Sequence, residues 1–312
     1  MRALIVSPEP LDSTRGNSIT AVRWAEIFRK LGHDVSVATD WTGSSGKDFE
    51  LLIALHARRS HSSIAAFPGP VVLGLTGTDL YGDLPGNAEA RDSVSLATRI
   101  VVLQRAALQE LDESARAKTR VIYQSSVAAT RGQPQDNCFD VCVLAHLRDV
   151  KDPLRAAEAS RRLPVSSKVR VLHAGRAMDA TWEEAARSEE RTNPRYRWLG
   201  ELSHEGAAQL LARSRLLVLS SKMEGGANAI SESVVCGVPA LCSDIPGNIG
   251  MLDVGYPGYF PVGDTGKLAE LLNRAETDPG FLGSLNEFVR KLQPRFAPEQ
   301  ELASWKSLLS EL

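Results

Sequence analysis

The sequence predicts an α/β protein of two domains, each built around a parallel β-sheet. The chain has 312 residues, which is long for a single hydrophobic core. Continuous apolar runs alternate with helix-like patterns, as expected for strands that helices cover on both faces. Near the middle, residues 127–137 lose the apolar pattern and contain Gly, Pro, Gln and Asp, which is typical of a linker.

The first half starts with a predicted strand at 4–6, followed by a loop that prolines interrupt. Asn17 or Ser18 can cap the next helix, which is predicted to end near Leu31. Further strands are predicted from apolar runs at 35–38, 51–55, 71–75, 100–103 and 120–122. Strand, loop, helix and strand make a right-handed parallel unit, so we expect one parallel sheet in this half.

Small, polar and basic residues follow the strands of the first half. Ligands of open α/β sheets bind at the carboxyl ends of the strands, so these residues are candidates for a substrate-binding rim. The candidates are Arg15, Gly16, Asn17, His56, Arg58, Thr76 and Thr78. His56 suits either a general acid/base or a histidine held by the backbone, and the sequence leaves both open.

The second half repeats the alternation of strands and helices. Strands are predicted at 139–145, 169–173, 196–199, 216–219 and 239–242. Helices are predicted at 154–163, 182–190, 205–214, 229–236, 267–276 and 281–292. After two prolines comes a last amphipathic helix. The predicted domains are therefore 1–130 and 136–292, with residues 295–312 as a separate C-terminal helix.

Composition and charge exclude several classes of protein. The net charge of −2 offers no overall basic field, so we expect neither nucleic acid nor a membrane as partner. The apolar start is too short, and too soon broken by Pro8 and Pro10, to be a signal peptide. The four cysteines lie mostly in apolar surroundings without zinc-type spacing. We expect buried cysteines, no metal, no cofactor and a cytoplasmic location.

The most informative stretch is Glu224–Glu232, which reads EGGANAISE. It follows an apolar run and opens a helix, so free backbone N–H groups at the helix start can bind a phosphate. Gly225 and Gly226 allow a ligand to approach the backbone closely. The two glutamates can accept hydrogen bonds from the hydroxyls of a sugar or a ribose.

A second stretch, His146–Pro153, places Arg148 and Lys151 directly after a predicted strand. Two cations at that position can neutralise the charge that develops on a leaving diphosphate, without a metal ion. A solvated loop of mixed charge is the alternative, because Asp149 and Asp152 are interleaved with the cations.

Both stretches resemble signatures of GT-B glycosyltransferases of the family 4 type. The resemblance implies two Rossmann-like domains facing a central cleft, with the last helix crossing back to the first domain. It also implies that Arg148 and Lys151 grip the diphosphate of a UDP-sugar substrate, while Glu224 contacts the donor sugar. The donor-binding residues that it implies are Gly225, Gly226, Ala227, Asn228 and Glu232.

Further stretches are similar to one subgroup, the selenosugar synthases of the selenoneine pathway. They include 7–10, 15–24, 55–59, 75–81, 196–201 and 256–264. This similarity implies that a UDP-sugar, UDP-N-acetylglucosamine in particular, reacts with selenophosphate to form a carbon–selenium bond. The first-half rim would then hold the acceptor. A selenium nucleophile needs little deprotonation, so positioning and leaving-group stabilisation would carry the catalysis.

Three other functions are weighed against this one. A conventional family 4-type enzyme with an alcohol or lipid acceptor is the nearest alternative. A lipid acceptor favours an exposed basic and apolar patch, which the first helix does not show. A non-catalytic protein that only binds a nucleotide-sugar could lose the polar and basic residues of the first-half rim, but this sequence retains them. A dinucleotide dehydrogenase is disfavoured because neither half begins with a G-x-G-x-x-G turn.

Overall fold

The fold is described from a computed structural model of the chain. The described residues are 1–9, 16–43, 48–127, 129–130, 132, 135 and 137–312. Contacts divide the chain into two compact units, which are described separately. The N-terminal unit contains Met1–Gln124, Glu224–Gly226 and Glu299–Leu312, and the C-terminal unit contains Ser125–Met223 and Ala227–Pro298.

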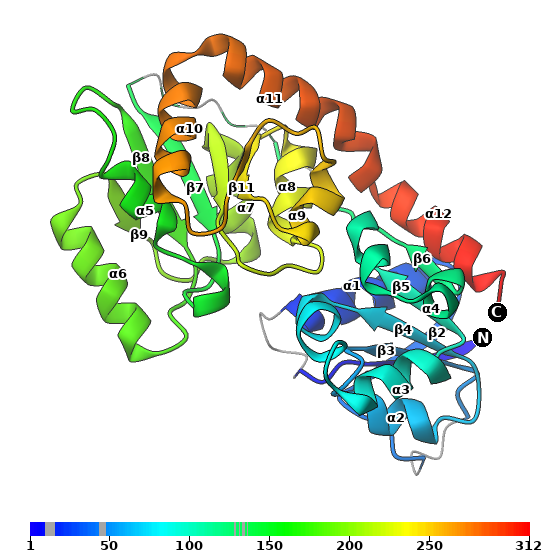
Figure 1. Cartoon of the computed structure of the whole chain (residues 1–312). Helices are drawn as coiled ribbons and strands as arrows, with labels where there is room; N and C mark the ends of the chain where they lie inside the picture. Colours follow the sequence, from blue (N-terminus) through cyan, green and yellow to red (C-terminus); the bar gives the residue numbers. More distant parts are fainter. Residues whose placement is uncertain (10–15, 44–47, 128, 131, 133–134, 136) are drawn as a thin grey trace. The chain divides into compact units, whose positions relative to one another are not determined.

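The N-terminal unit is built on a six-stranded parallel sheet in the order β2-β1-β3-β4-β5-β6 (Figure 1). Its strands are β1 (Arg2–Val6), β2 (Asp34–Ala38), β3 (Leu51–Leu55), β4 (Val71–Leu75), β5 (Arg99–Val102) and β6 (Thr119–Val121). The strand order reverses between β1 and β3. The carboxyl ends of these two strands therefore flank the position where open α/β sheets bind ligands.

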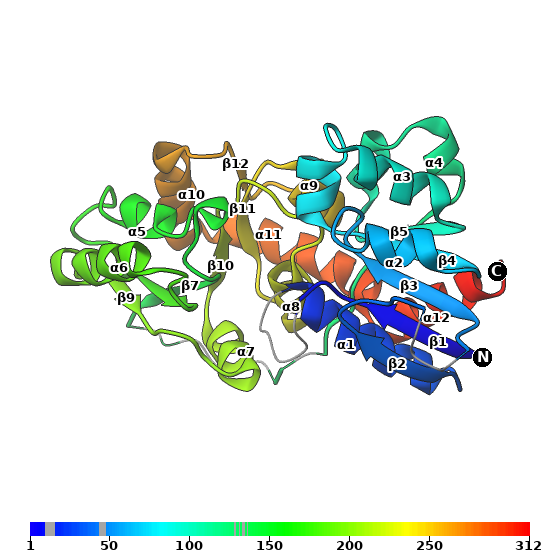
Figure 2. The ribbon, with the colours of Figure 1, turned by 90° about the horizontal axis from the view of Figure 1, so that it is seen from below.

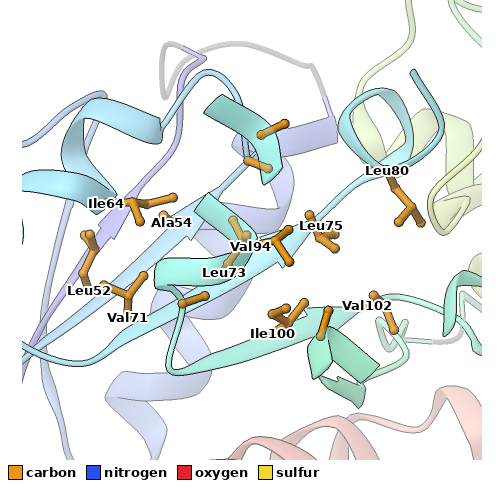
Figure 3. Packing of buried hydrophobic residues seen from close by; sticks show 14 of the residues in the cluster. Leu52, Ala54, Ile64, Val71, Leu73, Leu75, Leu80, Val94, Ile100 and Val102 are labelled. Atoms are coloured by element: carbon orange, nitrogen blue, oxygen red, sulfur yellow. The ribbon is translucent and has the colours of Figure 1, made fainter. Parts of the chain in front are cut away.

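Helices cover both faces of this sheet. They are α1 (Gly16–Lys30), α2 (His61–Ala66), α3 (Ala88–Leu96), α4 (Glu113–Ala117) and α12 (Pro298–Leu309), with the π-helix η1 (Asp79–Asp83) and the 3-10 helix η2 (Arg105–Glu110). On one face, Leu52 and Leu73 pack in a cluster with Ile64 of α2 and Val94 of α3 (Figure 3). Alternate residues of β3, such as Ile53, point to the other face and are buried there. Both faces of β3 are therefore buried, which explains why all of its residues are apolar.

The last helix, α12, packs on the opposite face of the N-terminal sheet together with α1 (Figure 2). Trp305 is fully buried, with its ring edge-on to Trp24 at 4.7 Å and to Phe28 at 5.1 Å between centroids. Beyond the helix, the carboxylate of Glu311 accepts hydrogen bonds from Arg99 and Arg120. Both contacts tie the end of the chain to the N-terminal unit.

The C-terminal unit has its own six-stranded parallel sheet, in the order β12-β11-β10-β7-β8-β9. The strands are β7 (Phe139–Leu144), β8 (Val169–Ala174), β9 (Tyr196–Trp198), β10 (Leu216–Leu219), β11 (Ala240–Ser243) and β12 (Tyr259–Phe260). Because β7 and β10 are paired neighbours, the segments that follow them start side by side. Those segments are the two stretches that the sequence analysis singled out.

Helices and short turns complete the C-terminal unit. They are η3 (Asp149–Lys151), α5 (Arg155–Ser160), α6 (Ala180–Thr192), α7 (His204–Arg213), α8 (Asn228–Cys236), α9 (Pro246–Leu252), α10 (Thr265–Thr277), α11 (Pro279–Leu292) and η4 (Gln293–Phe296). None of the helices in the described parts of the chain has the length and hydropathy to cross a membrane. All four cysteines are buried thiols, as predicted.

The two parallel sheets confirm the predicted α/β class, and strands β3, β4 and β10 match their predicted bounds. Helix α1 begins at Gly16, before both of the predicted caps, so the prediction that Asn17 or Ser18 caps it is wrong. Helices α2, α3, α4 and α9 and strand β12 were not predicted. Arg15, and residues 128, 131, 133, 134 and 136 of the predicted linker, lie outside the described residues.

Candidate active site

The two predicted cations lie on one turn at the carboxyl end of β7. Leu147 anchors its start, because its N–H donates to the Arg176 carbonyl at 2.9 Å and its carbonyl accepts from Met178 at 3.1 Å. The 3-10 helix η3 follows directly. Arg148 is exposed and Lys151 is half-buried. The turn therefore carries two basic side chains on a backbone that hydrogen bonds hold in place.

This cationic turn, residues 148–152, is also bonded to the segment that leads from β10 to the glycine turn. The N–H of Lys222 donates to the Val150 carbonyl at 2.8 Å. Its ammonium group lies 2.7 Å from the Asp149 carboxylate. The Ser220 hydroxyl donates to the Asp152 carbonyl at 2.8 Å. Two stretches that are far apart in the sequence are thereby joined by hydrogen bonds within one unit.

The glycines of the turn are required by packing within the N-terminal unit. A Cβ on Gly225 would collide with the backbone of Thr76 and Gly77. A Cβ on Gly226 would lie 2.5 Å from the Cβ of Leu103, well inside van der Waals contact. The sequence predicts that these glycines let a ligand come close to the backbone. The structure supplies a second reason, which is that another part of the chain also packs closely against them.

Helix α8 begins at Asn228 and its cap residue is Ala227, which offers no side-chain hydrogen bond. Its first N–H groups are therefore not satisfied by a capping side chain and can donate to an anion. Glu232 lies in the second turn of the same helix with 25% of its side chain exposed, 3.9 Å from His204. Glu224 is buried, and its contacts place it in the N-terminal unit.

The rim of the N-terminal sheet is organised by Asp79, which is fully buried. One carboxylate oxygen accepts from the Ala57 N–H at 2.9 Å, just after β3. The other accepts from both the N–H and the hydroxyl of Thr76 at 2.8 Å, just after β4. Asp79 thereby joins the loops that follow two neighbouring strands. The Thr76 hydroxyl, a candidate for ligand binding from the sequence, therefore already donates its hydrogen bond to Asp79.

His56 stands in the left-handed region with φ of 73°, which is uncommon for a residue with a side chain. Its ring is 2% exposed, and burial lowers its pKa, so the neutral form dominates at pH 7. Nδ1 accepts from the Arg59 N–H at 3.4 Å, which leaves the proton on Nε2. Nε2 lies 3.3 Å from the Thr78 hydroxyl and 3.7 Å from the Asp83 carboxylate.

Arg58 and Arg59, which follow β3, are both paired with carboxylates. Arg58 donates to Asp83 at 3.0 Å, and Arg59 is bonded to Glu9. About half of the Arg58 side chain remains exposed, so it is accessible to a ligand that competes with Asp83. Asp83 and Asp79 mark the two ends of the π-helix η1. The sequence showed these carboxylates but gave no signal for their pairing.

The two remaining rim candidates are at the start of α1. Gly16 is its first residue and is exposed, and Asn17 is half-buried. One turn along the helix, the Thr20 hydroxyl accepts from the Gln124 amide at 2.7 Å. The candidate rim therefore includes a helix N-terminus as well as the loops that Asp79 holds.

Two polar side chains on β8 and β9 of the C-terminal unit are held by structural contacts. His173 is fully buried between the Tyr196 hydroxyl and the Ala145 carbonyl, at 3.0 and 2.9 Å, as expected for a structural histidine. Trp198 of β9 donates its indole N–H to the Gly175 carbonyl at 2.8 Å, and the Arg187 guanidinium lies over its ring. Among the described residues, no group of three or more His, Cys, Asp and Glu is arranged to hold a metal ion.

One family model matches the chain. It is described as glycosyl transferases group 1 and matches residues 131–292, just over half of the sequence. The matched segment contains the cationic turn, the glycine turn and Glu232.

Several solved structures share the fold over the whole chain. Anabaena Alr3699/HepE in complex with UDP and glucose has a TM-score of 0.78 and 17% identity, and 100% of each chain is covered. Sucrose-phosphate synthase from Thermosynechococcus elongatus has a TM-score of 0.76 and 14% identity, over 99% of this chain and 98% of that one. The lipopolysaccharide galactosyltransferase WaaB has a TM-score of 0.71 and 13% identity, over 100% and 99%. At such identities the likeness shows the fold.

Proposed function

Because this chain belongs to the glycosyl transferases group 1 family and is a glycosyltransferase of the GT-B fold, we propose that its donor is a UDP-sugar. The observation that carries the proposal is the hydrogen-bonded junction between the cationic turn and the segment leading to α8. Two basic side chains and an uncapped helix start belong to the same unit. The Anabaena protein with the same fold is in complex with UDP and glucose, which supports a uridine carrier.

In the proposed reaction, Arg148 and Lys151 stabilise the negative charge that grows on UDP as the sugar–oxygen bond breaks. The backbone N–H groups at the start of α8 add donors to the same phosphates. Glu232 accepts from the ribose hydroxyls and Glu224 contacts the donor sugar. With two cations present, the proposal needs no metal ion for leaving-group departure.

We further propose selenophosphate as the acceptor and N-acetylglucosamine as the sugar. The selenium atom attacks the anomeric carbon, the bond to UDP breaks, and water then cleaves the phosphorus–selenium bond. The products are the 1-selenosugar, UDP and phosphate. The subgroup similarity is the basis for this acceptor. The accessible guanidinium of Arg58 and the adjacent Arg59 can bind a small anion if they exchange their carboxylate partners for it.

One observation favours a second candidate. Arg58 and Arg59, the arginines after β3, each have a carboxylate partner, so together they bring little excess positive charge to the rim. Such a rim suits a neutral hydroxyl acceptor, as in a conventional enzyme of this family.

The decisive experiment offers UDP-N-acetylglucosamine together with either selenophosphate or a panel of sugar and alcohol acceptors. Mass spectrometry then identifies the products. Selenophosphate is expected to give a 1-selenosugar in equal amount to UDP, and phosphate alone should give no sugar product. Transfer to an alcohol, with selenophosphate left unreacted, would establish the second candidate instead. No consumption of any UDP-sugar would refute the donor assignment.

A further inference from the structure

Asp152 closes the cationic turn in an unfavourable backbone conformation. Its φ and ψ are 45° and 56°, in the left-handed region. Among the described residues, only two others that are not glycine have positive φ. Aspartate tolerates this region better than most residues, but the conformation persists only where neighbouring contacts enforce it. Lys151 precedes Asp152 directly, so the direction of the lysine depends on this backbone.

Arg155 supplies the enforcing contact from the first turn of α5. Its Nε and one terminal nitrogen donate to the two carboxylate oxygens of Asp152, at 2.8 and 3.1 Å. The other terminal nitrogen donates to the Thr265 hydroxyl at 2.6 Å, at the start of α10. Both side chains of the pair are mostly buried, with 20% of Arg155 and 14% of Asp152 exposed. The pairing with Asp152 raises the pKa of Arg155.

The other side of the turn is held by β10. The Ser220 hydroxyl is buried and donates to the Asp152 carbonyl, so the backbone and the side chain of Asp152 are fixed by different elements. Lys151 itself has a long, flexible side chain whose ammonium is a point charge. Such a group stabilises the charge of a transition state best when the backbone that carries it is fixed before the substrate binds.

We propose that Asp152 and Arg155 are positioning residues that hold Lys151 and Arg148 for the donor diphosphate. The inference rests on the proposed function, since it deepens the role of the same turn. Arg155 has a second task in this arrangement. It neutralises a carboxylate that would otherwise attract Lys151 and repel an arriving anion.

Two substitutions separate these tasks. Asp152→Gly removes the carboxylate but suits positive φ, so the chain folds while the turn loses its side-chain clamp. Arg155→Met removes the clamp and leaves the carboxylate uncompensated beside Lys151. We expect both to lower kcat/KM for the UDP-sugar by on the order of tenfold to a hundredfold, with Arg155→Met the worse. The double variant should recover part of the loss that Arg155→Met causes. Asp152→Asn, which keeps one acceptor oxygen, should fall between the wild type and Asp152→Gly.

The matched controls remove carboxylates that are not part of the turn. Glu158→Gln removes the remaining carboxylate partner of Arg155, on the outer side of α5. Glu189→Ala breaks a similar two-bond pair with Arg161, at 2.8 and 2.9 Å, in the same unit. Both should leave UDP affinity unchanged, although Glu189→Ala should lower the thermal midpoint.

Calorimetric titration with UDP and thermal unfolding are measured on all variants of the full chain. The proposal is supported if Asp152→Gly and Arg155→Met weaken UDP binding while the controls do not. It is overturned if wild-type and folded Asp152→Gly protein bind UDP equally, or if the double variant is no better than Arg155→Met. A wild-type protein that does not bind UDP would overturn the proposed function itself, which is a distinct result.

Discussion

At the scale of single residues, Asp79 and Asp152 perform the same kind of task in different units. Each is a carboxylate that fixes a loop at the carboxyl end of a strand. Carboxylates suit this task because two oxygens can accept from several donors at once. Burying Asp79 is tolerated because hydrogen bonds to backbone and hydroxyl donors replace the lost water.

Asp79→Asn tests that role. The substituted amide keeps one oxygen, but its NH₂ group would face another donor, either the Ala57 N–H or the Thr76 donors. We expect a loss of about 1–3 kcal/mol in the free energy of unfolding, measured in urea. Asp112→Asn is the control, because Asp112 caps α4 and asparagine caps helices equally well. Equal stability of Asp79→Asn and wild type would contradict the assigned role.

Arg58→Ala tests the acceptor side of the rim. The change removes the accessible guanidinium, so KM for selenophosphate should rise by about tenfold while KM for the UDP-sugar changes little. Steady-state kinetics with each substrate varied in turn measures the two effects. Arg91→Ala, on the exposed face of α3, serves as the control. A parallel rise in both KM values would rule out an acceptor-specific role.

His173 predicts how stability depends on pH. Burial lowers its pKa to about 4 in the folded protein, against 6.5 for an exposed histidine. Between these values the unfolded chain binds more protons, so stability is full above pH 6.5 and falls as the pH drops toward 4. The histidine accounts for roughly 3 kcal/mol of this fall. Urea unfolding across this range should show a flatter profile for His173→Gln, and an unchanged slope would disprove the assignment.

At the scale of elements, α12 completes the core of the N-terminal unit. Its Trp305 and Leu308 are buried among residues of α1 and of the sheet. Without α12, the aromatic side chains of α1 that pack against Trp305 would be exposed to water. The contact is therefore part of the N-terminal core, although the helix comes last in the chain.

Trp305→Ala should cost about 3–5 kcal/mol in the free energy of unfolding, because it leaves a large cavity beside Trp24 and Phe28. Denaturant unfolding followed by circular dichroism measures this loss. Lys306→Ala changes the next, exposed residue of the same helix and should be within about 0.5 kcal/mol of wild type. Similar values for the two variants would show that α12 is not part of the core.

At the scale of the whole molecule, the candidate residues are divided between the two units. The cationic turn and Glu232 lie in the C-terminal unit, and the Asp79 loops lie in the N-terminal one. Under the proposed function, substitutions in the cationic turn should affect the donor, and substitutions in the loops that Asp79 holds should affect the acceptor. A protein that only binds a nucleotide-sugar should respond to the first kind of substitution alone.

Arg148→Ala and Glu232→Ala should each lower turnover by on the order of 10²-fold, because each removes a proposed contact to the departing UDP. Release of UDP from the UDP-sugar is the measured quantity. Lys168→Ala removes an exposed cation of the same unit and should keep full activity. Unchanged UDP release in either of the first two variants would exclude the role assigned to that residue.

The amino-acid pattern alone determined the α/β class, most strands and the two stretches of the proposed donor site. Apolar runs and capping residues act locally, so they can be recognised without knowledge of the partner strand. The same applies to Arg148 and Glu224, whose neighbours in sequence form the motifs. Predicted bounds differ from the observed ones mainly at helix ends, as in α1, which includes both Asn17 and Ser18.

Only the tertiary structure decided the strand order of each sheet, the packing position of α12 and the partners of the charged groups. Arg155 reaches Thr265 across the C-terminal unit, and Gly226 is constrained by Leu103 of the N-terminal one. Such contacts join residues that are far apart in sequence. Their geometry depends on the order of the strands in the sheet and on the path of the connections between them. A local pattern shows which groups are present, whereas long-range packing decides which of them meet.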